Sequence, residues 1–119
     1  MKQEEKSLLL KDLSARLLYG VMIEVQHKLG KLTSIDIDDN DEVIIYSSDC
    51  DEDAKIEYCK PYLRPMSSMT EEEEVFYNIK YPFIKNHEKV DWLNRKMFDY
   101  RGLIPKGLAL EAPEGMYKL

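Results

Sequence analysis

The first residues that suggest chemistry are acidic side chains near the middle of the chain. Asp36, Asp38 and Asn40 have the spacing of the first three calcium ligands in an EF-hand loop. Such a loop also needs a glycine at its sixth position and a glutamate at its twelfth, where this chain has Asp41 and Ser47. We therefore expect a solvated hairpin turn here and no metal site. A second acidic cluster also lacks the glycine and the glutamate that such a loop needs; it comprises Asp49, Asp51 and Asp53.

Two histidines and two cysteines supply the residue types that bind zinc, but no pair has the short spacing of a zinc knuckle. Neither histidine belongs to a recognisable nucleophile motif, and the chain has no glycine-rich phosphate loop. We predict that the protein is not an enzyme and that it needs no metal or other cofactor. The four residues concerned are His27, Cys50, Cys59 and His87.

The last third of the chain interleaves aromatic and basic side chains. This mixture is typical of hot spots in protein interfaces and of platforms for single-stranded nucleic acid. An alternative stays open, because Trp92 and Tyr100 are also the residues that a hydrophobic core would use. The predicted protein-binding residues are Trp92, Arg95, Lys96, Phe98, Tyr100 and Arg101.

Charge is unevenly distributed along the chain. The net charge is −6, yet residues 1–74 hold 18 of the 23 acidic residues and only nine of the 17 basic ones. The overall charge argues against bulk attraction to nucleic acid or anionic lipid. Lys55 is the only basic residue between Asp36 and Glu57, and we interpret this acidic region as protection of a sheet edge. The alternative is a row of carboxylates that imitates a phosphate backbone towards a basic partner.

At 119 residues the chain has the length of one domain with its own core. The charged N-terminus lacks the apolar run and the cleavage site of a signal peptide, and no stretch approaches the roughly 20 apolar residues of a membrane span. We expect a cytoplasmic protein that does not enter the membrane.

The first half of the chain predicts a helix followed by strands. Ser7 is a candidate cap for a helix with Leu10, Leu13 and Leu17 on its apolar face, and Gly20 is its stop. Residues 21–59 then show alternating short runs separated by turns. We expect the Ile37 side chain to point into the core, and Ile56 and Tyr58 to lie on the same face of their strand. The predicted strands are 21–25, 31–37, 42–46 and 54–59, with a turn at 27–30 and a strand end at Pro61.

The second half predicts two helices and a packed tail. Thr70 and Glu73 form a capping box for a helix with Val75, Phe76 and Ile79 inward. A second helix begins at a cap on Asn86 and places Val90, Leu93, Met97 and Tyr100 on one face. The whole is an α+β domain, 1–119, in which 1–64 form the first helix and an antiparallel SH3-like sheet or partly open barrel, and 65–119 form a helical extension and tail.

Three stretches carry a resemblance to a known family. They are KDLSARLLYGVMIEV from Lys11, KPYLRPMSSMTEEE from Lys60 and FDYRGLIPKGLALEAPEGMY from Phe98. In these stretches the chain resembles small uncharacterised proteins of gut Bacteroides-type bacteria and their phages or mobile elements. The resemblance implies a bacterial or phage setting and an accessory role.

These observations favour a non-enzymatic adaptor or modulator that binds another protein. The alternative is a nucleic-acid-binding accessory protein that uses the sheet as a platform and a basic face near the C-terminus. That alternative requires five basic residues to gather on one surface: Lys28, Lys31, Arg95, Lys96 and Arg101.

Overall fold

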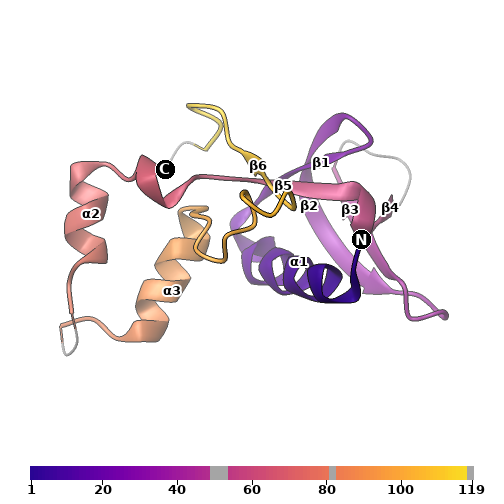
Figure 1. Cartoon of the computed structure of the whole chain (residues 1–119), viewed down its shortest axis with the longest axis horizontal. Helices are drawn as coiled ribbons and strands as arrows, with labels where there is room; N and C mark the ends of the chain where they lie inside the picture. Colours follow the sequence, from indigo (N-terminus) through magenta and orange to yellow (C-terminus); the bar gives the residue numbers. More distant parts are fainter. Residues whose placement is uncertain (49–53, 81–82, 118–119) are drawn as a thin grey trace.

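The computed structural model describes residues 1–48, 54–80 and 83–117. Within these residues the chain is an α+β protein with an N-terminal helix, a six-stranded open sheet that is mostly antiparallel, and two further helices. The molecule measures 45 × 27 × 24 Å. Figure 1 shows the sheet and the first helix at one end of the long axis and the two later helices at the other. The predicted fold class is therefore confirmed.

The first helix, α1 (Gln3–Arg16), begins earlier than predicted. Ser7 lies inside it, because the cap position is Lys2, whose backbone N–H donates to Glu5 Oε1 at 3.0 Å. A 3-10 turn, η1 (Leu17–Tyr19), follows and stops at Gly20 with φ 75°, as predicted. The buried face also differs, since Leu9 and Leu13 are fully buried whereas Leu10 and Leu17 lie at the margin of the core.

Four strands follow as an antiparallel meander. Val21, Ile23 and Val25 are buried, which confirms the predicted alternation. The first turn is shorter than predicted: only Gln26 and His27 leave the ladder, both with positive φ. The strands are β1 (Met22–Val25), β2 (Lys28–Ile37), β3 (Val43–Ser47) and β4 (Ala54–Lys55).

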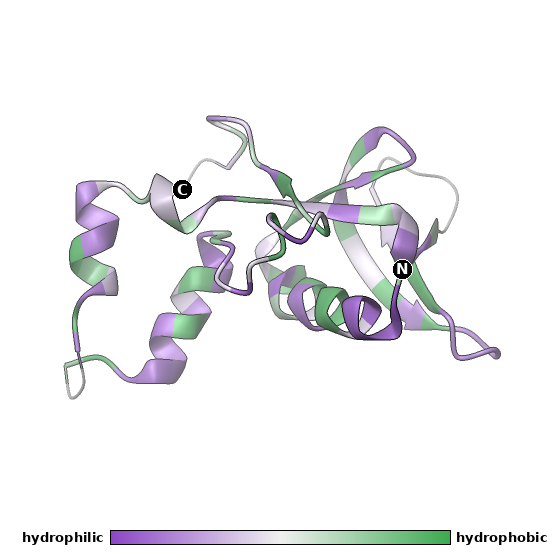
Figure 2. Cartoon of the chain, in the orientation of Figure 1, coloured by the Kyte–Doolittle hydropathy of each residue, from purple (hydrophilic) through white to green (hydrophobic). Residues whose placement is uncertain are grey.

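One predicted inward residue of β2 is exposed. The register of β2 against β3 shifts between Leu32 and Ser34. Leu32 is buried before this irregularity, whereas Ile37, in the last register pair before the hairpin turn, is 58% exposed. The expected inward position of Ile37 is therefore wrong, because it lies where the hairpin leaves the core. Figure 2 shows hydrophilic residues at the tip of this hairpin.

The predicted strand 54–59 is two strands. A 3-10 turn, η2 (Ile56–Tyr58), separates β4 from β5 (Cys59–Leu63). This turn rotates Tyr58 outward, where it is 61% exposed while Ile56 is buried, so the two do not share a face. The strand does not end at Pro61 either, since β5 pairs with β1 through Pro61 opposite Ile23.

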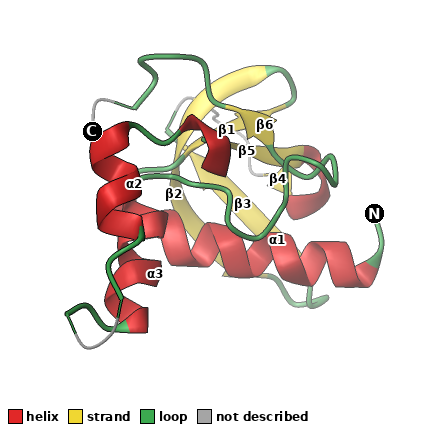
Figure 3. Cartoon of the chain, turned by 60° about the vertical axis from the view of Figure 1, so that its left-hand side comes forward, coloured by secondary structure: helices red, strands yellow, loops and turns green. Residues whose placement is uncertain are grey.

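The sixth strand comes from the tail. β6 (Leu110–Glu111) runs parallel to β5, so the order across the sheet is β4-β3-β2-β1-β5-β6. The tail is therefore packed, as predicted, and β4 and β6 are the edges of the sheet. Figure 3 shows α1 lying across one face of the sheet.

The two later helices form the other end of the molecule. Thr70 caps α2 (Glu71–Tyr77) in a capping box with Glu73, as predicted. Val75 is 69% exposed and not inward, because α2 turns only one narrow face to its neighbours, with Phe76 against Trp92. None of the helices in the described part of the chain is long and apolar enough to cross a membrane.

The last helix, α3 (Asn86–Arg95), is shorter than predicted. Its cap position is Lys85, without a side-chain capping bond, so Asn86 is the first helical residue. Met97 has φ 63°, which breaks the helix and separates Met97 and Tyr100 from the helical face that was expected to include them. Two clusters of buried side chains result: the larger joins α1, the sheet and the tail, and the smaller comprises Trp92, Leu93 and Phe98.

Candidate functional site

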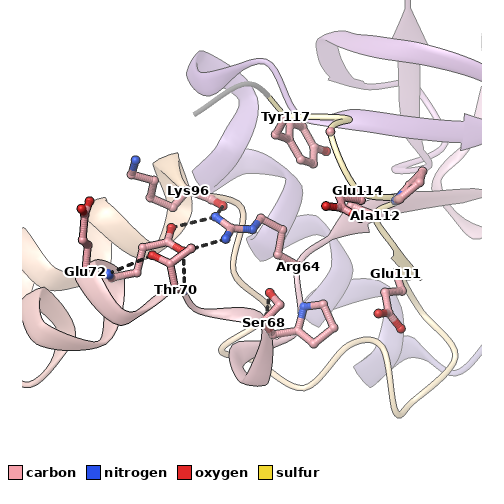
Figure 4. A pocket seen from close by; sticks show the side chains of 13 residues that line it. Arg64, Ser68, Thr70, Glu72, Lys96, Glu111, Ala112, Glu114 and Tyr117 are labelled. Carbon is pink, nitrogen blue, oxygen red and sulfur yellow. Dashed lines mark hydrogen bonds and ion pairs between the residues drawn. The ribbon is translucent and has the colours of Figure 1, made fainter.

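A cleft of about 650 Å³ lies between the start of α2 and the C-terminal tail. Its walls come from three parts of the chain: the segment after β5, the end of α3, and the segment from Glu111 to Tyr117 (Figure 4). Charged and polar side chains dominate its lining, with Pro65, Ala112 and Pro113 between them. The charged residues are Arg64, Glu72, Glu73, Lys96, Glu111 and Glu114.

An ion pair between Arg64 and Glu73 fixes one wall of the cleft. Arg64 Nη2 donates to Glu73 Oε1 at 2.8 Å, and Nη1 donates to Glu73 Oε2 at 2.9 Å. The guanidinium also lies 4.2 Å from the centre of the Phe98 ring, and Nη1 reaches the Lys96 carbonyl at 3.3 Å. A two-pronged contact of this kind is rigid, because the planar guanidinium matches both carboxylate oxygens.

Glu73 also completes the cap of α2. Its Oε1 accepts a hydrogen bond from the Thr70 backbone N–H at 3.0 Å, and its own N–H donates to Thr70 Oγ1 at 3.2 Å. The hydrogen bonds from Arg64 are the largest reason that the pKa of Glu73 falls from 4.5 to about 2. The carboxylate therefore stays charged and keeps the start of α2 attached to the end of β5.

Tyr117 anchors the opposite wall. Its hydroxyl accepts a hydrogen bond from the Met22 N–H at 2.9 Å and donates one to the Tyr62 carbonyl at 2.6 Å. Since Ile23 pairs with Pro61 in an antiparallel register, Met22 and Tyr62 would be the next pair in that ladder. The Tyr117 hydroxyl thus bridges the place where β1 and β5 separate. Burial raises the pKa of Tyr117 to about 12, so the hydroxyl remains a donor.

Four charges of the cleft have no ion pair among residues 1–48, 54–80 and 83–117. Arg64 and Glu73 neutralise one another. The remaining charges are three carboxylates, on Glu72, Glu111 and Glu114, and one cation, on Lys96. Figure 4 shows the Glu114 side chain beside Tyr117 and Ala112, on the wall opposite Lys96. The cleft is therefore acidic on the side of the tail.

The same wall contains an edge of the sheet, since no strand among the described residues pairs with the outer side of β6. The Ala112 N–H donates to the Leu63 carbonyl at 2.7 Å, so Ala112 faces β5. Neighbouring residues of a strand turn their backbone groups to opposite sides. The N–H and C=O of Glu111 therefore point away from β5, at the edge where β6 ends the sheet.

The structure does not bring the six predicted binding residues to one surface. Trp92 is 6% exposed and Phe98 is fully buried, with ring centres 5.6 Å apart. Tyr100 donates its hydroxyl proton to Asn94 Oδ1 at 2.8 Å, and Arg101 pairs with Asp12. Arg95 is exposed at the end of α3, and only Lys96 lines the cleft.

A buried ionic cluster joins α1 to the segment after α3. Asp12 accepts hydrogen bonds from Arg16 Nε and Nη2 at 3.1 Å, and from Arg101 Nη1 at 2.8 Å. Arg16 Nη2 also donates to the Phe98 carbonyl, at 2.6 Å. Asp12 and Arg16 are both fully buried. Their spacing of four residues is the one signal of this cluster in the sequence.

The residues considered as metal ligands are scattered. Asp38 Oδ1 accepts hydrogen bonds from the N–H groups of Asn40 and Glu42, at 2.9 and 3.0 Å, and so shapes the hairpin turn. His27 and His87 are exposed, whereas Cys59 is buried. No group of three metal-ligating side chains occurs in the described part of the chain. Four candidates lie outside the described residues: Asp49, Cys50, Asp51 and Asp53.

The cleft offers two kinds of recognition. The backbone of Glu111 can form hydrogen bonds with an added strand, and the unpaired carboxylates can bind a charged side chain. Thr70 and Ser68 line the cleft as hydroxyl groups, but neither has a histidine beside it in the lining. No family model, curated protein or solved structure matches this chain.

Proposed function

We propose that the protein is a non-enzymatic adaptor or modulator that binds an extended segment of another protein at β6. The observation that carries this proposal is the outward-facing backbone of Glu111, at a free sheet edge beside the cleft. A segment that adds to a sheet edge gains hydrogen bonds from its main chain and specificity from its side chains. The backbone of β6 would supply the main-chain hydrogen bonds, and the cleft would supply the specificity.

The length of the edge limits how the segment binds. Pro113 follows two residues after Glu111 and has no N–H to donate. Main-chain pairing is therefore centred on Glu111, and side-chain contacts in the cleft must supply much of the affinity. With so little main-chain pairing we expect a small interface, and small interfaces are typical of reversible complexes.

Trp92 and Phe98 keep an indirect role in this proposal. Phe98 lies beneath the Arg64 guanidinium, and Trp92 packs against Phe98 and Phe76. These aromatic residues support the wall of the cleft and do not contact the partner. Substitution of Trp92 should therefore affect binding only through folding.

Selection of peptides from a random display library tests the proposal. We expect enriched peptides to bind the wild-type chain and to slow hydrogen exchange at the amide of Glu111. Glu111→Pro removes this N–H, which β5 does not use, and should abolish binding. The matched control is Glu111→Gln, which also removes the carboxylate but keeps the backbone donor, so the further loss in Glu111→Pro reports on the N–H alone. Failure to enrich any peptide, or unchanged binding by a folded Glu111→Pro variant, would overturn the proposal.

One observation favours the nucleic-acid alternative. Two lysines and two tyrosines lie on the sheet face that α1 does not cover (Figure 3), because they alternate with buried residues of their strands. They are Lys31, Tyr46, Lys60 and Tyr62. An SH3-like sheet could stack bases on such tyrosines. The five basic residues expected to gather are divided, since Arg101 pairs with buried Asp12 while Lys96 lines the cleft.

A labelled single-stranded oligonucleotide tests this alternative. Fluorescence anisotropy would show saturable binding that weakens between 50 and 200 mM salt, as counterion release requires. Tyr46→Ala and Tyr62→Ala should then weaken binding. We propose the cytoplasm of a bacterium, or of a phage-infected bacterium, as the setting of either function.

A further inference from the structure

We infer that the segment bound at β6 carries a lysine or arginine whose cation lies between Glu111 and Glu114. This inference rests on the proposed function, because it names the chemistry of the same site. It also predicts the register in which the segment binds.

The charges of the cleft lead to this choice. Glu72, Glu111 and Glu114 line it without an ion pair to any described residue. Lys96, the one unpaired cation of this lining, lies on the side of Glu72 and across the cleft from Glu111 and Glu114 (Figure 4). Arg64 cannot attract an anion strongly, since both of its terminal nitrogens already donate to Glu73. A cationic side chain therefore complements the cleft, whereas an anionic one meets three carboxylates.

The geometry of strand addition brings that side chain to the carboxylates. In an antiparallel pair, the residue that exchanges both hydrogen bonds with Glu111 lies directly opposite it and points its side chain to the same face of the sheet. The Glu111 side chain lines the cleft. The side chain opposite Glu111 consequently enters the cleft as well, and Glu114 lies three residues further along the same wall.

Two other features fit a long basic side chain. Ala112 and Pro113 lie between the two glutamates in the sequence and line the same cleft, so a methylene stem can pack on them while its charged end reaches Glu114. Lys96 lies on the opposite wall and repels a cation. The basic residue is therefore directed to the side of the tail.

A set of labelled peptides tests the inference. Each peptide has a short alternating Thr–Val sequence, and its central residue is arginine, the neutral analogue citrulline, or glutamate. We expect the arginine peptide to bind more tightly than the citrulline peptide by about five- to tenfold, and the glutamate peptide to bind least. Fluorescence anisotropy at 50 and 200 mM salt measures these differences, which should shrink as salt rises.

Protein variants assign the effect to the two carboxylates. Glu111→Gln and Glu114→Gln should each reduce the preference for arginine over citrulline by about two- to fivefold. The matched control, Asp39→Asn, removes one negative charge from the exposed β2–β3 turn and should leave the preference unchanged.

The outcomes separate this inference from the proposed function. Equal binding of arginine and citrulline peptides, both abolished by Glu111→Pro, would overturn the cation assignment and leave strand addition in place. A preference for the glutamate peptide would overturn it too, in favour of an anion at Lys96. Absence of binding by every peptide would count against the proposed function itself.

Discussion

Arg64 and Glu73 are joined by two parallel hydrogen bonds of 2.8 and 2.9 Å, which link the end of β5 to the first turn of α2. The pair lies where the sheet and the helical end of the molecule meet, and both side chains are largely shielded from solvent. One ion pair thus positions the wall of the cleft and the N-terminus of a helix together.

Acid should weaken this junction. The pKa of Glu73 is about 2 in the folded protein against 4.5 for the ordinary group, so its contribution to stability is complete above about pH 4.5 and is lost as the pH falls towards 2. Urea unfolding at pH 5 and pH 3 measures this loss. Glu73→Gln should show a smaller loss than the wild type, whereas Glu72→Gln, which removes an exposed neighbour, should behave as the wild type does. Equal losses in all three proteins would contradict the prediction.

Removal of the Tyr117 hydroxyl should destabilise the fold. Tyr117→Phe leaves the Met22 N–H and the Tyr62 carbonyl without their shared partner. An unsatisfied buried polar group costs about 1–3 kcal/mol, so we expect a fall of this size in the free energy of unfolding. Chemical denaturation measures it, and Tyr58→Phe, at an exposed tyrosine, is the control. A loss no larger than that of the control would show that the bridge is dispensable.

The buried ionic cluster should tolerate joint replacement better than the loss of one member. Asp12→Ala leaves Arg16 buried without its carboxylate and should cost about 3–5 kcal/mol. Asp12→Leu combined with Arg16→Met removes both buried charges and should cost less than Asp12→Ala alone. Chemical denaturation of both variants and the wild type measures the two losses in the free energy of unfolding. A larger cost for the double variant would contradict the prediction, and would mean that the hydrogen bond from Arg16 to the Phe98 carbonyl outweighs the cost of burying the two charges.

Trp92 should report on the core in fluorescence. It is the single tryptophan and is 6% exposed, so the folded protein should emit at short wavelength and shift to long wavelength on unfolding. Trp92→Ala should cost about 3–5 kcal/mol because it leaves a cavity beside Phe76 and Phe98. Trp92→Phe should retain most of the stability. Emission typical of a solvated indole in the folded protein would contradict the burial of Trp92.

Much of the secondary structure could be predicted from the sequence, because its signals act over a few residues. Gly20 stops the first helix through its own backbone conformation, and Thr70 caps α2 through contacts with Glu73. The alternation of Val21, Ile23 and Val25 determines which face of β1 is buried. The same local logic fails at the 3-10 turn Ile56–Tyr58 and at Met97, where the backbone departs from the regular period.

The candidate site depended on contacts that no local pattern encodes. Tyr117 and Met22 are 95 residues apart in the sequence, and the pairing of β5 with β6 joins segments almost 50 residues apart. Whether Trp92 would be an exposed anchor or a core residue depended on Phe98 and Phe76, which only the folded chain places around it. The sequence determined the order of helices and strands, the stop at Gly20, the cap of α2 and the buried face of β1, since these follow from neighbouring residues. The tertiary structure alone decided the cleft and the free edge of β6, because both arise where distant segments meet.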